Sequence, residues 1–311
     1  MIGVGYTMRR FFFNQLLRYL IFIFTLNAFA SDINERFVEL SKESKFELIG
    51  KIECKFTSYH PQGLLKIGDD YYLSSVQILK ERKKYDRPDE HGHDRSAGNG
   101  IGHLFKIDAR GRLIKELTFV EGNSYHPSGI DGAGGYIWLS VAEYRPESCS
   151  TIFKVDTAFT QCEKAFTVRD HIGGLVYNKD KDLLYGFSWG SRRIYCWTSA
   201  GVELYRYSNP SHFIDYQDAK YIGDGCMLAS GLNKFMVSPA KPQDLWELGG
   251  LAMIELATAK IVHEIPLLLR SDTGVIMTRN PMDVQLSDSS LRFYFAPEDN
   301  QTIIYIYQVR F

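Results

Sequence analysis

Two stretches of this chain are nearly the same: S-Y-H-P-Q-G-L at residues 58–64 and S-Y-H-P-S-G-I at residues 124–130. They are the strongest members of a series of related segments. The series starts, in order, at His60, His126, His171, Asp215 and Asn280. These starts lie 66, 45, 44 and 65 residues apart, as the differences between their numbers show. Recurrence on this scale indicates a repeat architecture.

Each start is followed by short aromatic or aliphatic segments that are typical of strands, such as Tyr136-Ile137-Trp138-Leu139. Four short strands in about 45 residues is the period of a propeller blade. The sequence therefore predicts an all-β fold, a β-propeller of five blades. Six blades stay open if the long stretches 76–102 and 231–249 conceal a degenerate blade, although their charge, glycine and proline content favours insertions.

The fifth unit ends at Phe311 after its third strand. We expect the missing outer strand to come from the N-terminal segment Phe46–Phe56, which would close the ring by pairing both ends of the chain in one blade. The alternation of apolar residues from Ile303 to Phe311 is also typical of the last strand of an outer-membrane β-barrel. That alternative requires segments of about 10 alternating residues throughout, whereas these strands are shorter and fall in groups of four.

The N-terminus reads as a secretory signal. Arg9 and Arg10 precede an apolar run, Tyr19–Ala30, which ends in a small-residue cleavage pattern before Ser31. We predict a signal peptide at 1–30, a lead-in segment at 31–45 and a propeller domain at 46–311. The protein is then expected to be periplasmic or secreted, with no stable membrane insertion after cleavage.

Composition excludes some functions. The formal net charge is −1, and removal of the three arginines of the signal gives −1 − 3 = −4. The basic residues of the cluster Lys80–Lys84 are diluted by acids, so no nucleic-acid partner is expected. None of the five cysteines forms a C-x-x-C pair. Cys149 and Cys162 flank one predicted hairpin and are the candidate disulfide, while buried free thiols are the alternative.

In a propeller, the first strand of each blade lines the central channel. The repeated starts should then meet at the channel mouth, where His60, His126, His171 and Asp215 could hold one divalent metal ion. Asn280 completes this ring as a ligand-binding residue. For each histidine, a structural hydrogen bond to a neighbouring blade is the alternative.

Loops between second and third strands should reach the same face. They contribute candidate ligand-binding and catalytic side chains, because arginine pairs with carboxylate or phosphate groups and tryptophan offers a flat face. The ligand-binding candidates on loops are Arg145, Trp189, Arg192 and His212, and the candidate general bases are Glu143 and Glu298.

Three functions remain open. The first is a binding module for a small polar or anionic ligand, or a protein partner, at the axial pore. The second is a metal-dependent hydrolase of esters, lactones or phosphoesters, in which Glu143 or Glu298 activates a metal-bound water. The third is the outer-membrane barrel. Whether the protein is an enzyme stays undecided by the sequence.

The second half of the chain also resembles an uncharacterised family of exported bacterial propeller proteins. The segments that carry the resemblance are Ala142–Pro146, His171–Gly174, Ser188–Arg193 and Asn209–Asp218. The resemblance implies a propeller with no established activity. A wider likeness to lactonase and gluconolactonase propellers concerns the fold alone, because those enzymes surround their metal with carboxylates and an asparagine, where this chain has three histidines.

Overall fold

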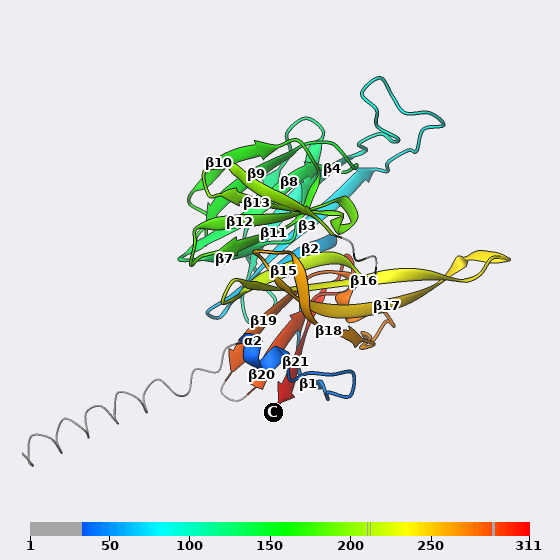
Figure 1. Cartoon of the computed structure of the whole chain (residues 1–311). Helices are drawn as coiled ribbons and strands as arrows, with labels where there is room; N and C mark the ends of the chain where they lie inside the picture. Colours follow the sequence, from blue (N-terminus) through cyan, green and yellow to red (C-terminus); the bar gives the residue numbers. More distant parts are fainter. Residues whose placement is uncertain (1–32, 210, 212, 288–289) are drawn as a thin grey trace, which may run out of the picture.

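Five antiparallel sheets account for the fold in the computed structural model, which describes residues 33–209, 211, 213–287 and 290–311 (Figure 1). The predicted signal peptide lies outside this part of the chain. No described helix is long and apolar enough to cross a membrane. The five-bladed propeller predicted from the repeats is confirmed.

The blades follow one another along the chain, each running from the channel to the rim. Blade one comprises β2 (His60–Ile67), β3 (Asp70–Lys80), β4 (Asn99–Ile107) and β5 (Leu113–Phe119). Blade two comprises β6 (Ser124–Pro127), β7 (Asp131–Ala133), β8 (Tyr136–Glu143), β9 (Ser150–Asp156) and β10 (Cys162–Val168). Blade three comprises β11 (Ile172–Asn178), β12 (Leu183–Ser188), β13 (Arg193–Thr198) and β14 (Glu203–Ser208). Blades four and five comprise β15 (Asp215–Gly223), β16 (Cys226–Ser238), β17 (Lys241–Glu255) and β18 (Lys260–Leu267); and β19 (Met282–Ser287), β20 (Ser290–Phe295), β21 (Ile303–Arg310) and β1 (Glu47–Glu53).

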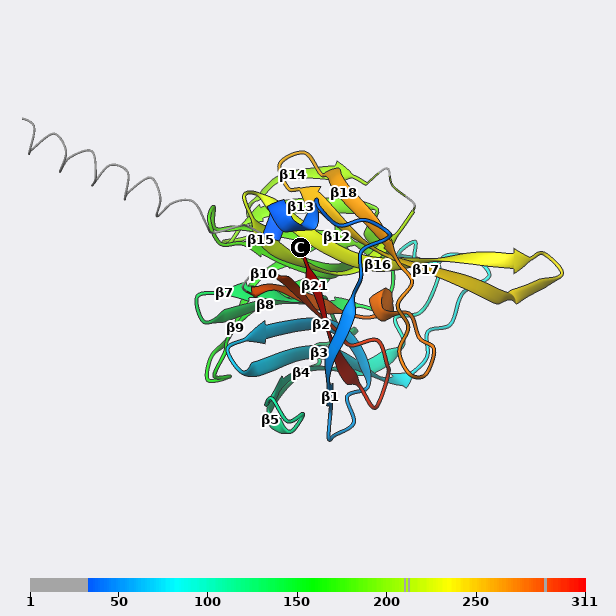
Figure 2. The same cartoon turned by 90° about the horizontal axis from the view of Figure 1, so that it is seen from below.

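The ring is closed by the N-terminal strand, as predicted. β1 pairs antiparallel with β21, from Glu47 opposite Gln308 to Glu53 opposite Ile303. Figure 2 shows β1 (blue) beside β21 (dark red). The C-terminal strand is therefore an interior strand of one four-stranded blade, and the separate sheets do not support the outer-membrane alternative.

The two long stretches are insertions rather than a sixth blade. In the first, β3 and β4 are prolonged and joined by residues 81–98. In the second, β16 and β17 continue beyond the body as a paired ribbon that reaches Ser238 opposite Lys241. Both project from the ring (Figure 1). Two strands cannot form a four-stranded blade, so the number of blades is five.

Packing between blades supplies the core. Each of the five blade interfaces encloses its own cluster of buried apolar side chains. Strands in the middle of a blade, such as β12, are buried along almost their whole length, while no residue of the outer strand β14 is fully buried. The short helix α2 (Ile33–Phe37) adds Phe37 to the cluster between blades four and five.

The disulfide predicted between Cys149 and Cys162 is wrong, and all five cysteines are free thiols. Cys149 precedes Ser150, which lies opposite Val168, whereas Cys162 lies opposite Val155. The two cysteines therefore lie at opposite ends of the β9–β10 hairpin, about 20 Å apart at the usual rise of a strand. A disulfide requires Cα atoms within about 7 Å.

The channel is filled by close backbone contacts that the repeated glycines permit. A Cβ atom on Gly63 would lie 2.5 Å from the Ile130 nitrogen, and one on Gly129 would lie 2.6 Å from an Asp218 carboxylate oxygen. Both glycines belong to the duplicated stretch. Close packing of the inner strands therefore explains both glycines, since no side chain would fit at either position.

Buried carboxylates join the inner strands at the channel. Asp131, Asp218 and Asp283 are almost fully buried and lie near Lys220, whose Nζ is 2.7 Å from an Asp218 oxygen. The bonds that cross between blades run from the backbone N–H of Leu64 to Asp218 (3.1 Å), of Lys66 to Asp283 (2.7 Å), and of Tyr177 and Tyr221 to Asp131 (3.0 and 2.9 Å). Burial raises the pKa of Asp131 to about 6 and those of Asp218 and Asp283 to about 7.

We expect the Lys220→Met variant to unfold more easily, by about 3–5 kcal/mol at pH 8, because ionised buried carboxylates would lose their ion-pair partner. The raised carboxyl pKa values contribute stability that is complete below the unfolded value of 3.8 and is lost as the pH rises through 6 to 7. The loss in the variant should therefore be smaller at pH 5 than at pH 8.

Urea denaturation at the two pH values measures this difference. Lys260→Met, which removes an exposed lysine at the start of β18, serves as the matched control and should change little at either pH. An equal loss at both pH values in Lys220→Met would show that the lysine does not compensate the channel carboxylates.

Candidate functional site

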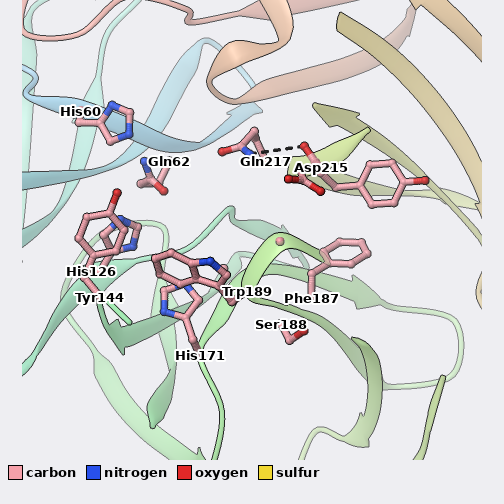
Figure 3. Close-up of a pocket in the computed structure, with 13 residues that line it drawn as sticks. His60, Gln62, His126, Tyr144, His171, Phe187, Ser188, Trp189, Asp215 and Gln217 are labelled. Carbon is pink, nitrogen blue, oxygen red and sulfur yellow. Dashed lines mark hydrogen bonds between the residues drawn. The ribbon is translucent and has the colours of Figure 1, made fainter. Parts of the chain in front are cut away.

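A cavity of about 250 Å³ lies at the mouth of the channel, where the inner strands of blades one to four begin. Figure 3 shows its side chains converging from these blades. The lining consists of His60, Gln62, His126, Tyr144, His171, Gly173, Phe187, Ser188, Trp189, Gly190, Asp215, Tyr216 and Gln217. Four of the five predicted ring positions therefore line one cavity.

The repeated motif places these side chains. The inner strands of blades one to four each contain a register shift close to their start, as between Pro61 and Gly63 and between Ser124 and His126. Such a bulge redirects the side chain beside it. His60 and His126 occupy the same position of the duplicated stretch, so their blades bring them to the same mouth.

His126 is a buried residue of the cavity lining. It is 4% exposed, and neither of its ring nitrogens has a hydrogen-bond partner among the described residues. Its ring stacks on Tyr144 with centroids 4.0 Å apart. Burial, followed by the nearby His171, His60 and Arg82, lowers the pKa of His126 well below its usual range. The ring is therefore neutral at pH 7, with one nitrogen that donates and one that accepts.

His171 is held in one tautomer. Its Nδ1 lies 2.8 Å from the backbone oxygen of Glu143, which can only accept, so Nδ1 carries the proton. Burial lowers the pKa of His171 to about 4. Nε2 of this neutral ring is consequently an acceptor. The ring meets Trp189 edge to face, with centroids 4.8 Å apart.

His60 is turned toward blade five. Its Nδ1 lies 2.7 Å from an oxygen of Asp299, which also accepts a hydrogen bond from the Asn280 amide at 3.0 Å. Burial raises the pKa of Asp299, but the bonds from His60 and Asn280 and the charge of Arg279 outweigh it, and the net change lowers the pKa. Asn280 thus positions the Asp299–His60 pair from behind the cavity lining.

Asp215 reaches the cavity as part of an ion pair. One carboxylate oxygen lies 3.3 Å from Arg192. Arg192 also donates to the backbone oxygens of Gly190 and Ser211, at 2.6 and 2.7 Å. This arginine braces the loops of blades three and four, and it does not line the cavity.

The two predicted general bases lie away from the lining. Glu143 forms a two-pronged ion pair with Arg145 at 2.7 Å, and Arg145 is also 3.6 Å from Asp89. Glu298 accepts a hydrogen bond from the Tyr305 hydroxyl at 2.9 Å and is buried in blade five. Trp189 lines the cavity as expected, and His212 lies outside the described residues.

The predicted metal centre is not supported. Within the described chain, no group of three or more His, Cys, Asp or Glu side chains could hold a metal ion. His60 is directed to Asp299 and Asp215 to Arg192, which leaves His126 and His171 with ring centroids 5.7 Å apart. Because the described residues offer no metal set, and because Glu143 and Glu298 are paired outside the lining, the hydrolase alternative has no support.

Sequence reasoning missed Arg82. This residue of the first insertion lies over the Tyr144 ring, with its guanidinium carbon 3.5 Å from the centroid, and 5.2 Å from the centroid of Trp189. Its Nε and Nη1 are buried without a hydrogen-bond partner among the described residues. A charged insertion gives no sign of which arginine folds back onto the ring. Gln62 belongs to the first copy of the duplicated stretch, but the second copy has Ser128 at this position. Comparison of the two copies therefore did not indicate that Gln62 lines the cavity.

The fold and the cavity define a five-bladed β-propeller with a polar pocket at one end of its channel. A model of a family of unknown function (DUF6454) matches residues 23–311, and the chain belongs to this family. The resemblance to an uncharacterised propeller family is thereby confirmed. A search of curated proteins gave no match.

Several solved structures are similar to this chain at low identity. A tail fiber of Staphylococcus aureus phage P68 is 11% identical with a TM-score of 0.50, over 89% of this chain and 55% of that chain. A DUF4221 member from Bacteroides vulgatus is 9% identical with a TM-score of 0.41, over 87% and 99%. A luciferin-regenerating enzyme is 10% identical with a TM-score of 0.47, over 86% and 95%. Such identities concern the fold alone.

We expect His171 to remain a neutral, Nδ1-protonated ring between pH 5.5 and 8, because burial holds its pKa at about 4. NMR spectra of protein labelled with ¹⁵N-histidine distinguish the tautomers and follow the titration. In the urea-unfolded protein, the same resonances should titrate near the ordinary value of about 6.5. Protonation of His171 above pH 6 in the folded protein would contradict the lowered pKa, and a neutral ring protonated on Nε2 would contradict the assigned tautomer.

Proposed function

We propose that this propeller binds a small polar ligand in the cavity at its channel mouth. His126 carries the proposal. A buried polar group without a partner is unfavourable by about 1–3 kcal/mol, and native proteins contain few of them. Both nitrogens are covered by surrounding atoms, so a ligand that enters the cavity and displaces those atoms would supply the partner that the described chain does not offer to this ring.

The dimensions and lining support a small ligand. The volume of about 250 Å³ lies just below the usual range for drug-sized molecules. The rings of Trp189 and Phe187 line the cavity together with Tyr144, whose two faces are covered by His126 and Arg82, and with the polar ends of Gln62 and Gln217. Flat apolar walls with a few fixed polar groups are the usual construction of a small-molecule site.

We further propose that the protein acts outside the cytoplasm. The basis is the sequence of residues 1–30, where arginines precede an apolar run and a small-residue cleavage pattern. Fractionation of cells that produce the full chain, with N-terminal sequencing of the mature product, tests this proposal. A product that keeps residues 1–30 in the cytoplasm would contradict it.

Ligand binding is tested by screening water-soluble metabolites for thermal stabilisation and for quenching of Trp189 fluorescence. His126→Phe keeps the ring that stacks on Tyr144 but removes both nitrogens. We expect this variant to fold and to bind the hits about tenfold more weakly, which is the effect of losing about one buried hydrogen bond.

His103→Phe is the matched control. His103 is also 4% exposed and stacked between aromatic rings, but it lies away from the cavity lining. Ligand affinity should therefore be unchanged in this variant. The proposal fails if no compound stabilises the wild type, or if the two variants weaken binding equally.

A further inference from the structure

The cavity presents fixed hydrogen-bond acceptors. His171 Nε2 is an acceptor because Nδ1 donates to the Glu143 backbone. The amide nitrogens of Gln62 and Gln217 each donate one hydrogen to a backbone oxygen, at 3.0 and 3.4 Å. This orients the side chains, and each keeps its amide oxygen as an acceptor and one N–H as a donor (Figure 3). The carboxylate of Asp215 adds further acceptor oxygens.

The Nε2 acceptor of His171 lies beside Gly173, which has no side chain to cover it. A Cβ atom on Gly173 would lie 3.4 Å from Nε2 of His171, and Gly173 itself lines the cavity. The absence of a side chain at this position keeps the nitrogen accessible from the cavity. A ligand atom that donates a hydrogen bond can therefore approach it.

The charges around the cavity disfavour a cation. Arg82 lies behind the two aromatic walls, 3.5 Å from the Tyr144 centroid and 5.2 Å from the Trp189 centroid, and the described chain offers it no acidic partner. A positive ligand on those rings would be repelled by this guanidinium. The cation–π position on Tyr144 is also already taken.

The same lining disfavours an anion. An anion would face the carboxylate of Asp215 and the acceptor atoms of His171 and the two glutamines. Among the described residues, no charged donor belongs to the cavity lining apart from the His60 ring paired with Asp299. The remaining charges are already paired, since Asp215 lies 3.3 Å from Arg192 and Asp299 lies 2.7 Å from His60. A hydroxyl group suits this arrangement because it donates one hydrogen bond, accepts others and carries no charge.

We propose that the ligand is a neutral polyhydroxyl ring, such as a monosaccharide unit, that donates its hydroxyls to the acceptors of the cavity and lays its carbon face against Trp189. This proposal rests on the proposed function and names the class of ligand for the same cavity. His126 completes the recognition once the ligand displaces the atoms that cover its ring, because the two unpaired nitrogens can then donate to and accept from a hydroxyl.

The test uses one set of scaffolds in three charge forms. The probes are D-glucose, D-galactose and D-mannose with their uronic acids and their 2-amino derivatives, and binding to the mature protein is measured by saturation-transfer NMR and titration calorimetry. At least one neutral sugar should bind, at least tenfold more tightly than its acidic and amino counterparts.

Two variants probe the reason for this selectivity. Gly173→Ala places a methyl group against His171 Nε2 without changing charge, and it should weaken the neutral sugar by about tenfold. Arg82→Met removes the positive charge behind the rings. The preference for the neutral sugar over its amino derivative should then fall at least threefold.

The possible outcomes distinguish a wrong ligand class from a cavity that binds no ligand. Tighter binding of a uronic acid or an amino sugar overturns the neutral ligand, while the cavity remains a binding site. Failure of every sugar also overturns the proposed class, and the metabolite screen described above then decides whether the cavity binds anything. Unchanged neutral-sugar binding in Gly173→Ala would place the sugar elsewhere on the protein.

Discussion

Hydrogen bonds across the channel axis are the constraint on which the rest of the molecule depends. The carboxylates of Asp131, Asp218 and Asp283 accept backbone N–H groups from inner strands of other blades. Backbone N–H groups of inner strands that have no partner in their own sheet are hydrogen-bonded in this way. Buried backbone polar groups require such partners. The spacing of the inner strands is thereby fixed at the centre, and Gly129 allows Asp218 to approach.

The geometry of the cavity follows from the spacing of the inner strands at the channel axis. Its polar side chains stand at the starts of strands whose separation the channel sets, so His126 and His171 are held close although 45 residues separate them in the chain. Burial keeps both rings neutral, while Asp218 and Lys220 lie further along β15, and Asp131 and Asp283 lie on β7 and β19. The carboxylates and Lys220 therefore lie in the interior of the channel, where they join the blades. The side chains at the channel mouth form hydrogen bonds and carry little net charge.

The sequence predicted the blades, the closing strand and the meeting of the repeated starts, because these depend on period and strand pattern. It failed where the direction of a side chain decides the outcome. His60 and Asp215 were assigned to a metal, but each has a partner on a loop, in Asp299 and Arg192. Periodicity carries no information about such pairs. The position of Arg82 was likewise hidden, since its contact with Tyr144 depends on how an irregular insertion folds.

The first insertion shows how such a scaffold can change its selectivity. Arg82 and Arg95 approach Tyr144 and Trp189 from the side of the insertion, and Asp89 reaches Arg145 at 3.6 Å. None of these insertion residues belongs to the ring that the repeats create. The inner strands thus supply the hydrogen-bonding groups, whereas an added loop supplies the electrostatic field behind the aromatic walls. Under the proposed function, a change in that loop would alter which ligand charge is accepted without altering a residue on which the propeller depends, since surface loops tolerate change better than the strands they join.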